Sequence, residues 1–279
     1  MSTARDVQTD TAELIARRYG APLEGAPAEG TPVVDLQLRH RSVRRYLPGE
    51  VSDAQLELLI AAAQSGSQSS NLQVWSVVAV RDQDRKDRIS TAIGGRRYVE
   101  ECEVFLVWVV DFHRATQVVE RTGTAVETNA YLENTLVGFV DSGISAQNAL
   151  LAAESLGLGG VFVGSVRNNP LAVAEELGLP EYAFPAFGLA IGHPDPAEEA
   201  DTKPRLPQRA VLHHEQYDDA AWESGAEEYE ERLREYYARY GKPDYSWART
   251  LGGRVGPAEG LHGRQQMREW LSSKGLLSG

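Results

Sequence analysis

The chain has 279 residues, 42% hydrophobic and 24% charged, which is usual for a globular protein of one large domain or two modest ones. Its formal net charge of −12 argues against nucleic acid or an anionic membrane as the main partner. The single cysteine, Cys102, excludes an intramolecular disulfide and any CxxC metal or redox site. The sequence shows neither a signal-peptide pattern nor an apolar run of the ~20 residues that a membrane span needs, so we expect a cytoplasmic protein.

The first 39 residues are predicted to form an extension around one short helix. Apolar residues at helical spacing place this helix over residues 9–19, with Thr9 or Thr11 as its N-cap. The Gly- and Pro-rich segment 20–32 then interrupts regular structure. We expect an arm lying on the surface; an arm that reaches a partner subunit is the alternative.

A cluster of basic residues follows, over His40–Tyr46. Three arginines, a histidine and a serine lie within these seven residues of an otherwise acidic chain. Guanidinium groups bind phosphate oxygens through paired, charge-assisted hydrogen bonds. The cluster therefore predicts an anion-binding site.

The next segments predict a helix and a strand separated by a polar loop. Ser52 and Gln55 form a capping-box pattern at the start of a helix that Gly66 ends. Residues 67–73 are polar and small, and form either a ligand-binding loop or a plain serine-rich turn. A strand is expected over 74–80, a short helix over 84–93, and a strand buried on both faces over 104–110.

The second half of the chain is predicted to be mainly helical. Residues 115–137 are expected to be helical, and 138–157 to form a central helix buried on all sides, with Asp141, Gln147 and Asn148 as hydrogen-bonded core polar groups. Strands are predicted over 161–163 and 187–193, with a helix over 171–178 between them. Beyond Tyr217 an acidic helical segment, a Gly-rich loop and a last helix over 267–276 follow. This mixture, without strict βαβ alternation, indicates an α+β domain.

Several standard catalytic motifs are absent from the sequence. There is no GxGxxG after a first strand, no GxxxxGK[ST], no HExxH and no GxSxG. Four polar clusters remain, over 40–44, 67–73, 164–167 and 203–205, and three of them contain Arg or Lys. If they converge, they form a pocket of fixed cations and neutral donors that suits a phosphorylated, planar cofactor.

Four motifs resemble those of the flavin-dependent nitroreductase family, in its branch of oxygen-insensitive NADPH nitroreductases and NADPH-flavin oxidoreductases. They are HRSVRRY (40–46), SSNLQ (69–73), the block 141–169 and KPRLP (203–207), and the resemblance runs from about Leu36 to the C-terminus. It implies an α+β, three-layer fold with a central, mostly antiparallel sheet flanked by helices, in a domain-swapped type of homodimer. It also implies an N-terminal extension (1–35), an FMN-binding core (36–217) and a C-terminal helical extension (218–279) that wraps the partner subunit.

The resemblance further implies a tightly bound FMN, with NADPH or NADH as electron donor and no metal. Arg239 and Arg264 would bind NAD(P)H, although the arginine that usually follows the EYY motif is replaced by Tyr240. Arg96 stands where this branch often has glutamine. The residues implied as cofactor ligands are His40, Arg41, Ser42, Arg44, Ser69, Ser70, Gln73, Arg96, Gly164, Ser165, Arg167, Lys203 and Arg205.

The implied activity is ping-pong, two-electron hydride transfer from NAD(P)H through FMN to nitroaromatic, quinone or flavin acceptors. Such an enzyme needs no side-chain nucleophile, and Lys203 or Arg205 would stabilise the anionic reduced ring. A flavin-binding module that stores or supplies FMN with little turnover is the alternative, motivated by the altered tail. A third hypothesis is dehalogenation or ring fragmentation on the same fold.

Overall fold

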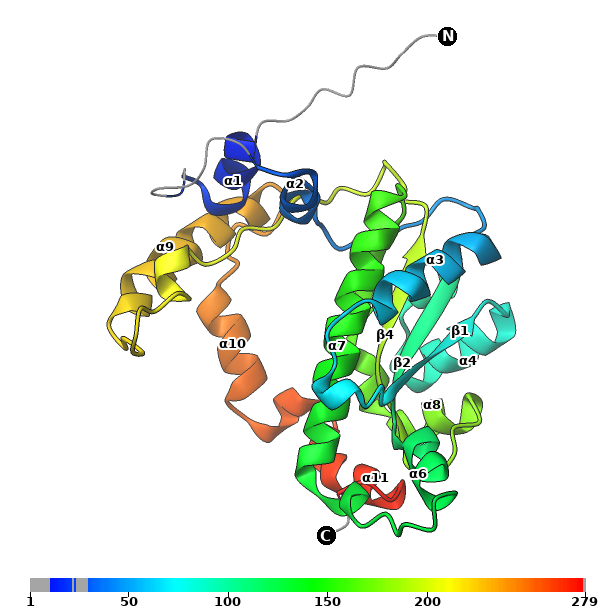
Figure 1. Cartoon of the computed structure of the whole chain (residues 1–279). Helices are drawn as coiled ribbons and strands as arrows, with labels where there is room; N and C mark the ends of the chain where they lie inside the picture. Colours follow the sequence, from blue (N-terminus) through cyan, green and yellow to red (C-terminus); the bar gives the residue numbers. More distant parts are fainter. Residues whose placement is uncertain (1–10, 22, 24–29, 278–279) are drawn as a thin grey trace. The chain divides into compact units, whose positions relative to one another are not determined.

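The computed structural model describes residues 11–21, 23 and 30–277, which belong to two compact units (Figure 1). The first unit consists of residues 1–41 and 199–260, and the second of residues 42–198 and 261–279. Within the described ranges, no helix combines the length and apolarity needed to cross a membrane. Thr9, one of the two predicted N-caps, lies outside the described residues.

The second unit is built on an antiparallel sheet of four strands in the order β1-β2-β4-β3. β2 is buried along nearly its whole length because both faces of the sheet are covered, as its continuous apolar run predicts. The strands are β1 (Trp75–Val80), β2 (Val104–Asp111), β3 (Gly159–Val163) and β4 (Ala183–Gly192).

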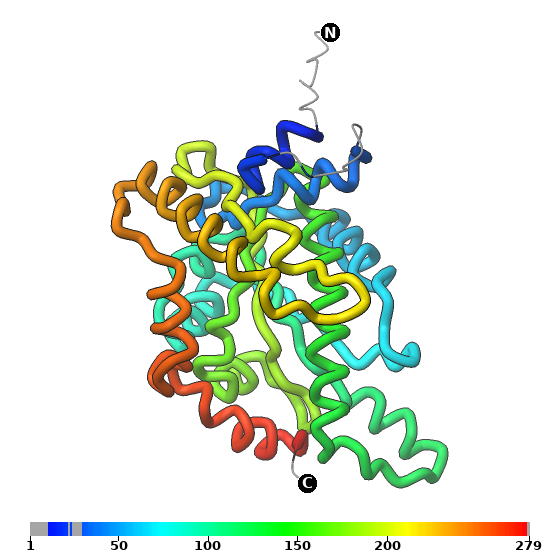
Figure 2. Tube along the Cα trace, turned by 90° about the vertical axis from the view of Figure 1, so that its left-hand side faces the viewer, coloured from blue at the N-terminus to red at the C-terminus, as the bar shows by residue number. Residues whose placement is uncertain are grey.

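Helices cover both faces of this sheet. Leu106 and Trp108 of β2 pack with α3 and α7 on one face, whereas Phe105 and Val107 pack with α4 and α8 on the other. Figure 2 shows α7, in green, extending beside the strands. The helices of this unit are α3 (Asp53–Gln64), α4 (Gln83–Ala92), α5 (Arg97–Glu101), α6 (Phe112–Glu120), α7 (Leu132–Ser155), α8 (Pro170–Glu176) and α11 (Met267–Ser273). The predicted three-layer α+β fold is confirmed.

Local sequence signals explain where α3 begins. The Ser52 backbone N–H donates to Gln55 Oε1 at 2.9 Å, and the Gln55 N–H donates to Ser52 Oγ at 3.2 Å. The predicted capping box is therefore present and satisfies two backbone donors of the first turn.

Helix α7 differs from its prediction in length and in burial. It begins at Leu132, while α6 ends at Glu120, so the expected continuous helicity over 115–137 is wrong. The expectation of burial on all sides is also wrong. Leu132, Leu136, Val140 and Ile144, spaced by four residues, expose 39–56% of their surface. This spacing places them on one face of the helix, which we name the α7 apolar face.

The first unit contains two helices that the sequence reasoning missed. Thr31 caps α2 (Pro32–Arg39), and Pro32 takes the first helical position, where a missing N–H costs little. Ser246 caps α10 (Trp247–Val255), whose Gly252 and Gly253 suggested a loop. The other helices of this unit are α1 (Thr11–Tyr19) and α9 (Ala221–Ala238).

Gly188, at the middle of β4, leaves room for a core aromatic ring. A Cβ at this position would lie 2.2 Å from Phe105 Cζ. We expect Gly188→Ala to lower the free energy of unfolding by about 1–3 kcal/mol, the usual cost of overpacking. Chemical denaturation measures this change. Gly252→Ala is the control, because nothing lies within 4 Å of its added Cβ, and it should leave stability unchanged or raise it.

Candidate functional site

Residues 43–47, in the C-terminal part of the basic cluster and just after it, lie in an extended conformation at the edge of the second unit's sheet. The Val43 N–H donates to Gly160 O at 3.0 Å, and the Leu47 N–H donates to His193 O at 2.9 Å. The Tyr46 hydroxyl donates toward Val43 O, 2.8 Å away, and burial raises the pKa of this phenol far above its usual value. Val43 is buried at this edge, whereas the next two residues, Arg44 and Arg45, are exposed.

Arg44 and Arg45 are adjacent but differ in their partners. Arg45 forms an ion pair with Asp195 at 2.9 Å and donates to Ala197 O at 3.2 Å. The backbone N–H of Arg44 donates to Glu198 Oε1 at 3.0 Å, but its guanidinium forms no ion pair with any described residue. Among the described residues, no carboxylate therefore occupies the planar donors of Arg44, which are of the kind that binds anions.

The polar loop 67–73 has unusual backbone geometry. Ser70, Asn71 and Gln73 have φ values of 48°, 55° and 53°, in the left-handed region that residues other than glycine rarely adopt. Such strain persists only where the surrounding structure holds it in place, and it is concentrated at functional sites. This geometry favours a ligand loop over a plain serine-rich turn.

Two side chains hold this loop in place. The Ser69 N–H donates to both carboxylate oxygens of Asp141, at 3.1 and 3.2 Å, and Asp141 is only 1% exposed on α7. At the other end, the Arg114 guanidinium donates to Gln73 O at 2.6 Å and to Trp75 O at 2.9 Å. The prediction that Asp141 is a hydrogen-bonded core polar group is confirmed, and its partner is the loop.

Arg96, Ser165 and Arg264 are linked to one region around the turn that follows β3. The Arg96 Nε–H donates to Ser165 Oγ at 3.4 Å, and Ser165 is 9% exposed. The Arg264 Nε–H donates at 2.9 Å to Asn168 Oδ1, in the same turn (Gly164–Asn168). Arg167 donates from the turn to Ala186 O at 2.5 Å. Gly164 opens the turn, and an added Cβ there would meet only Arg167, at 3.6 Å.

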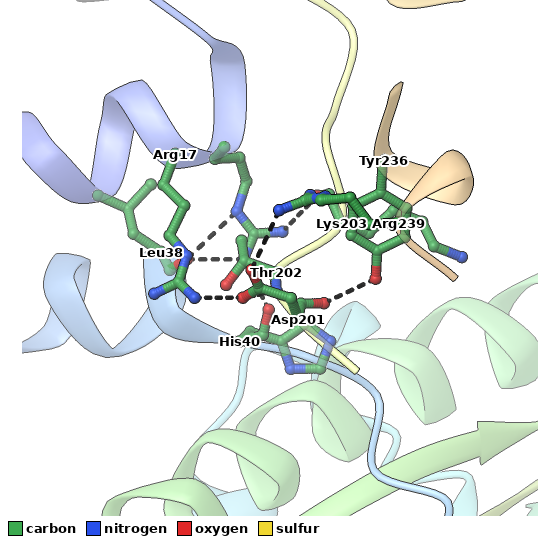
Figure 3. A network of polar contacts seen from close by, with 9 residues as sticks. Arg17, Leu38, His40, Asp201, Thr202, Lys203, Tyr236 and Arg239 are labelled. Atoms are coloured by element: carbon green, nitrogen blue, oxygen red, sulfur yellow. Dashed lines mark hydrogen bonds and ion pairs between the residues drawn. The ribbon is translucent and has the colours of Figure 1, made fainter. Parts of the chain in front are cut away.

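Of the other predicted ligands, Ser42 begins the second unit, whereas His40, Arg41, Lys203 and Arg205 lie in the first. Figure 3 labels His40 and Lys203. His40 is half-buried at the C-terminal end of α2, and Arg41 follows it. Lys203 Nζ lies 5.3 Å from the centre of the Tyr237 ring, which is cation–π geometry. The exposed Arg205 donates to the carbonyls of Lys203 and Pro204, both at 3.3 Å.

Arg239, the predicted NAD(P)H ligand, lies in the same unit. Its guanidinium is 3.8 Å from Asp201 Oδ2 and 5.1 Å from the centre of the Tyr236 ring. Asp201 also pairs with Arg17 of α1 (Figure 3). Since the Arg239 side chain is 60% exposed and its distance to Asp201 is long, this ion pair is weak.

Thiol and metal chemistry find little support among the described residues. Cys102 is 1% exposed, and burial raises the pKa of its thiol to about 12, which disfavours thiolate chemistry. Among the described residues, no group of three or more His, Cys, Asp or Glu side chains could hold a metal ion.

Sequence reasoning missed Arg18 and Arg114 as parts of these sites. Arg114 follows β2 by three residues, so its place after a strand end was a usable signal. Arg18 has no such signal, because its partners lie 20 and 185 residues away in the chain.

The second unit combines a three-layer α+β fold with an exposed arginine and a strained polar loop, features typical of a protein that binds an anionic ligand. The chain belongs to the nitroreductase family: the model described as "Nitroreductase family" matches residues 38–193, and that of its C-terminal domain matches residues 203–278. The family predicted from sequence is thereby confirmed.

Curated relatives and solved structures agree with this assignment. The chain is 37% identical over 245 residues to the NADPH-flavin oxidoreductase of Vibrio harveyi, covering 87% of this chain and 97% of the relative. It is 42% identical over 216 residues to the FMN reductase [NAD(P)H] of Bacillus subtilis, covering 76% of this chain and 86% of that one. The structure of B. megaterium NfrA2 matches with a TM-score of 0.83 and 34% identity, over 88% of this chain and 98% of that one. The Vibrio harveyi NADPH:FMN oxidoreductase complexed with NAD⁺ matches with a TM-score of 0.79 and 35% identity, over 89% and 100%.

Proposed function

We propose that this protein is an FMN-dependent NAD(P)H oxidoreductase. The relatives named NADPH-flavin oxidoreductase and FMN reductase support this activity. The observation that carries the proposal is the exposed Arg44 guanidinium beside the family's HRS sequence, which forms no ion pair with the residues that the structure describes. Nitroaromatics, quinones or free flavin are the proposed acceptors, taken up in a ping-pong cycle after the oxidised nucleotide has left.

The donor set on this chain fits FMN. A phosphate dianion is best bound by several charge-assisted donors, and Arg44, Arg41 and Ser42 supply guanidinium and hydroxyl groups within four residues. We assign His40, Arg41, Ser42 and Arg44 to the phosphate and ribityl end of the cofactor. The residues assigned to its ring are Ser69, Ser70, Gln73, Arg96, Gly164, Ser165 and Arg167.

Bound FMN supplies hydride acceptance and donation, so the protein contributes binding and electrostatics rather than a nucleophile. Lys203 and Arg205 are proposed to stabilise the negative charge that a reduced flavin ring carries. Arg205 suits this role because its guanidinium is exposed and donates to two neutral carbonyls. A cation that is not already neutralised by a carboxylate stabilises a new anion most strongly.

Arg239 is proposed to contact the extra phosphate of NADPH. We expect Arg239→Ala to raise the KM for NADPH by roughly tenfold, since one charge-assisted contact contributes about 1.5 kcal/mol or more. The KM for NADH and the value of kcat should change little, because NADH lacks that phosphate. Steady-state kinetics with both nucleotides measures the difference. An unchanged KM for NADPH would show that Arg239 does not bind this phosphate.

We propose that the protein is a homodimer whose subunits meet at the α7 apolar face. A row of four large apolar side chains on a core helix is costly in water and is typical of an interface. β1, an outer strand of the sheet, borders a hollow of about 750 Å³ lined by Ile60, Trp75 and Val77 among others. A segment from the C-terminal extension (218–279) of the partner is the proposed occupant.

The proposed dimer predicts the effect of a substitution at Val140, which is 56% exposed on the α7 apolar face. We expect Val140→Asp to convert the dimer to monomers, because the interface would then bury an unpaired carboxylate. Sedimentation velocity measures the mass in solution. Val118→Asp is the control, since Val118 is equally exposed but lies on α6. A wild-type protein that sediments as a monomer would contradict the proposal.

The proposed function is tested by steady-state oxidation of NADPH and NADH with a panel of quinones, nitroaromatics and FMN. We expect turnover with both nucleotides and with several acceptors. A yellow protein without turnover would indicate the flavin-storage alternative. A colourless protein that takes up no FMN would contradict both.

A further inference from the structure

Arg18 of α1 is a buried arginine without a role in the function described above. It lies in helix α1, which precedes the segments matched by the two family models, 38–193 and 203–278. The residue is 5% exposed, whereas its neighbour Arg17 has a side chain that is 54% exposed. Burying a guanidinium is costly unless its donors are satisfied, so its contacts are informative.

The Arg18 guanidinium donates to backbone carbonyls of two segments. It reaches Leu38 O at 2.7 Å and His40 O at 2.6 Å, at the end of α2. It also reaches Lys203 O at 3.3 Å. In return, the Arg205 N–H donates to the carbonyl of Arg18 at 3.1 Å. One residue therefore connects the backbone that carries His40 and Arg41 to the backbone that carries Lys203 and Arg205. Figure 3 labels Leu38, His40 and Lys203 of these two segments.

Other contacts fix α1 itself in the first unit. The Thr11 hydroxyl donates to Asp35 Oδ1 at 2.7 Å, between α1 and α2. Leu14 and Ile15 are buried on the same helix, at 3% and 6% exposure. Because both ends of α1 are held, Arg18 cannot follow a movement of either cationic segment without losing hydrogen bonds.

We propose that Arg18 is a positioning residue, which holds the His40–Arg41 and Lys203–Arg205 segments at the separation that FMN binding requires. The proposal rests on the assignment of these two segments to FMN. In this proposal Arg18 does not contact the cofactor. It holds backbone carbonyls of the two segments, and the side chains of these segments bind FMN. Its planar fork suits this task, since a lysine ammonium cannot donate along several fixed directions at comparable reach.

The test is FMN titration of apo-protein variants, at a temperature where circular dichroism shows each variant folded. Arg18→Met keeps an unbranched side chain as far as the position of Nε and removes every donor, and we expect it to raise the Kd for FMN by about tenfold, as for a 1.4 kcal/mol loss. Arg18→Lys should recover part of this affinity. Arg234→Met is the matched control, because Arg234 pairs with Glu231 on the surface of α9 and should bind FMN like the wild type.

A purely structural role gives a different result. The melting temperature of Arg18→Met and Arg18→Lys would then fall while the Kd of the folded protein stays at the wild-type value. That outcome would overturn the proposal, provided that Arg205→Ala weakens FMN binding in the same assay. If Arg41→Ala and Arg205→Ala also bind FMN normally, the assignment of the two segments to FMN is wrong instead. Should Arg18→Met not fold, the Kd of Arg18→Lys decides between these outcomes.

Discussion

Replacing Arg44 by alanine is expected to weaken FMN binding by roughly 10- to 150-fold, because hydrogen bonds to charged groups contribute about 1.5–3 kcal/mol. The Arg44 guanidinium is exposed and forms no ion pair with the described residues, so its loss should remove a ligand donor without breaking an ion pair among those residues. The purified variant should lose its yellow colour on dialysis, and titration of the apo-protein measures the remaining affinity.

Arg45→Ala provides the matched control for Arg44→Ala. Arg45 is the next residue and is also exposed, but Asp195 already pairs with it at 2.9 Å. Surface ion pairs contribute about 0–1 kcal/mol, so its removal should change neither folding nor FMN affinity appreciably. Equal losses of affinity in both variants would show that general positive charge, rather than the Arg44 guanidinium, attracts the cofactor.

Asp141→Ala should have the second large effect, through the loop 67–73. The Asp141 carboxylate accepts the Ser69 N–H, next to three non-glycine residues with positive φ. Left-handed backbone costs of order 1 kcal/mol for each such residue, so the loop should relax once its anchor is lost. We expect FMN affinity to fall roughly tenfold and stability by about 1–3 kcal/mol, the cost of an unsatisfied buried donor.

Hydrogen exchange of the amides in residues 67–73 reports on this relaxation directly. Exchange should become faster in Asp141→Ala and stay slow in Asn148→Ala. Asn148 lies on the same helix and donates to Ala62 O of α3 at 3.3 Å, so its hydrogen bond does not hold the loop. Unchanged exchange in Asp141→Ala would mean that Arg114 alone is sufficient to hold the loop.

Local patterns predicted those parts of the fold that depend on neighbouring residues. The capping box of Ser52 and Gln55 located α3, and the apolar run of 104–110 identified a strand buried on both faces. The prediction was wrong over residues 247–255, where glycines were given more weight than the N-cap that begins a helix. Gly252 and Gly253 suggested a loop, although Ser246 and Glu230 satisfy the first N–H groups of α10.

The sequence could not reveal features that depend on distant contacts. The apolar residues of α7 are compatible with burial in the subunit or with a face left for a partner, and only the fold distinguishes these cases. The contacts of Arg18 could not be predicted from sequence either, since two of its carbonyl partners lie 20 and 185 residues away in the chain. The basic cluster 40–46 was recognisable, but the difference between the paired Arg45 and the available Arg44 required the positions of Asp195 and Glu198.

The most direct test of the proposed function is an anaerobic half-reaction. The purified protein, saturated with FMN and freed of excess, is mixed with a small excess of NADPH or NADH while its visible flavin absorbance is followed. We predict rapid bleaching with either nucleotide, and full recovery of the absorbance when a quinone or nitroaromatic is added. A flavin spectrum that neither nucleotide bleaches, in protein that binds FMN stoichiometrically, would contradict the account.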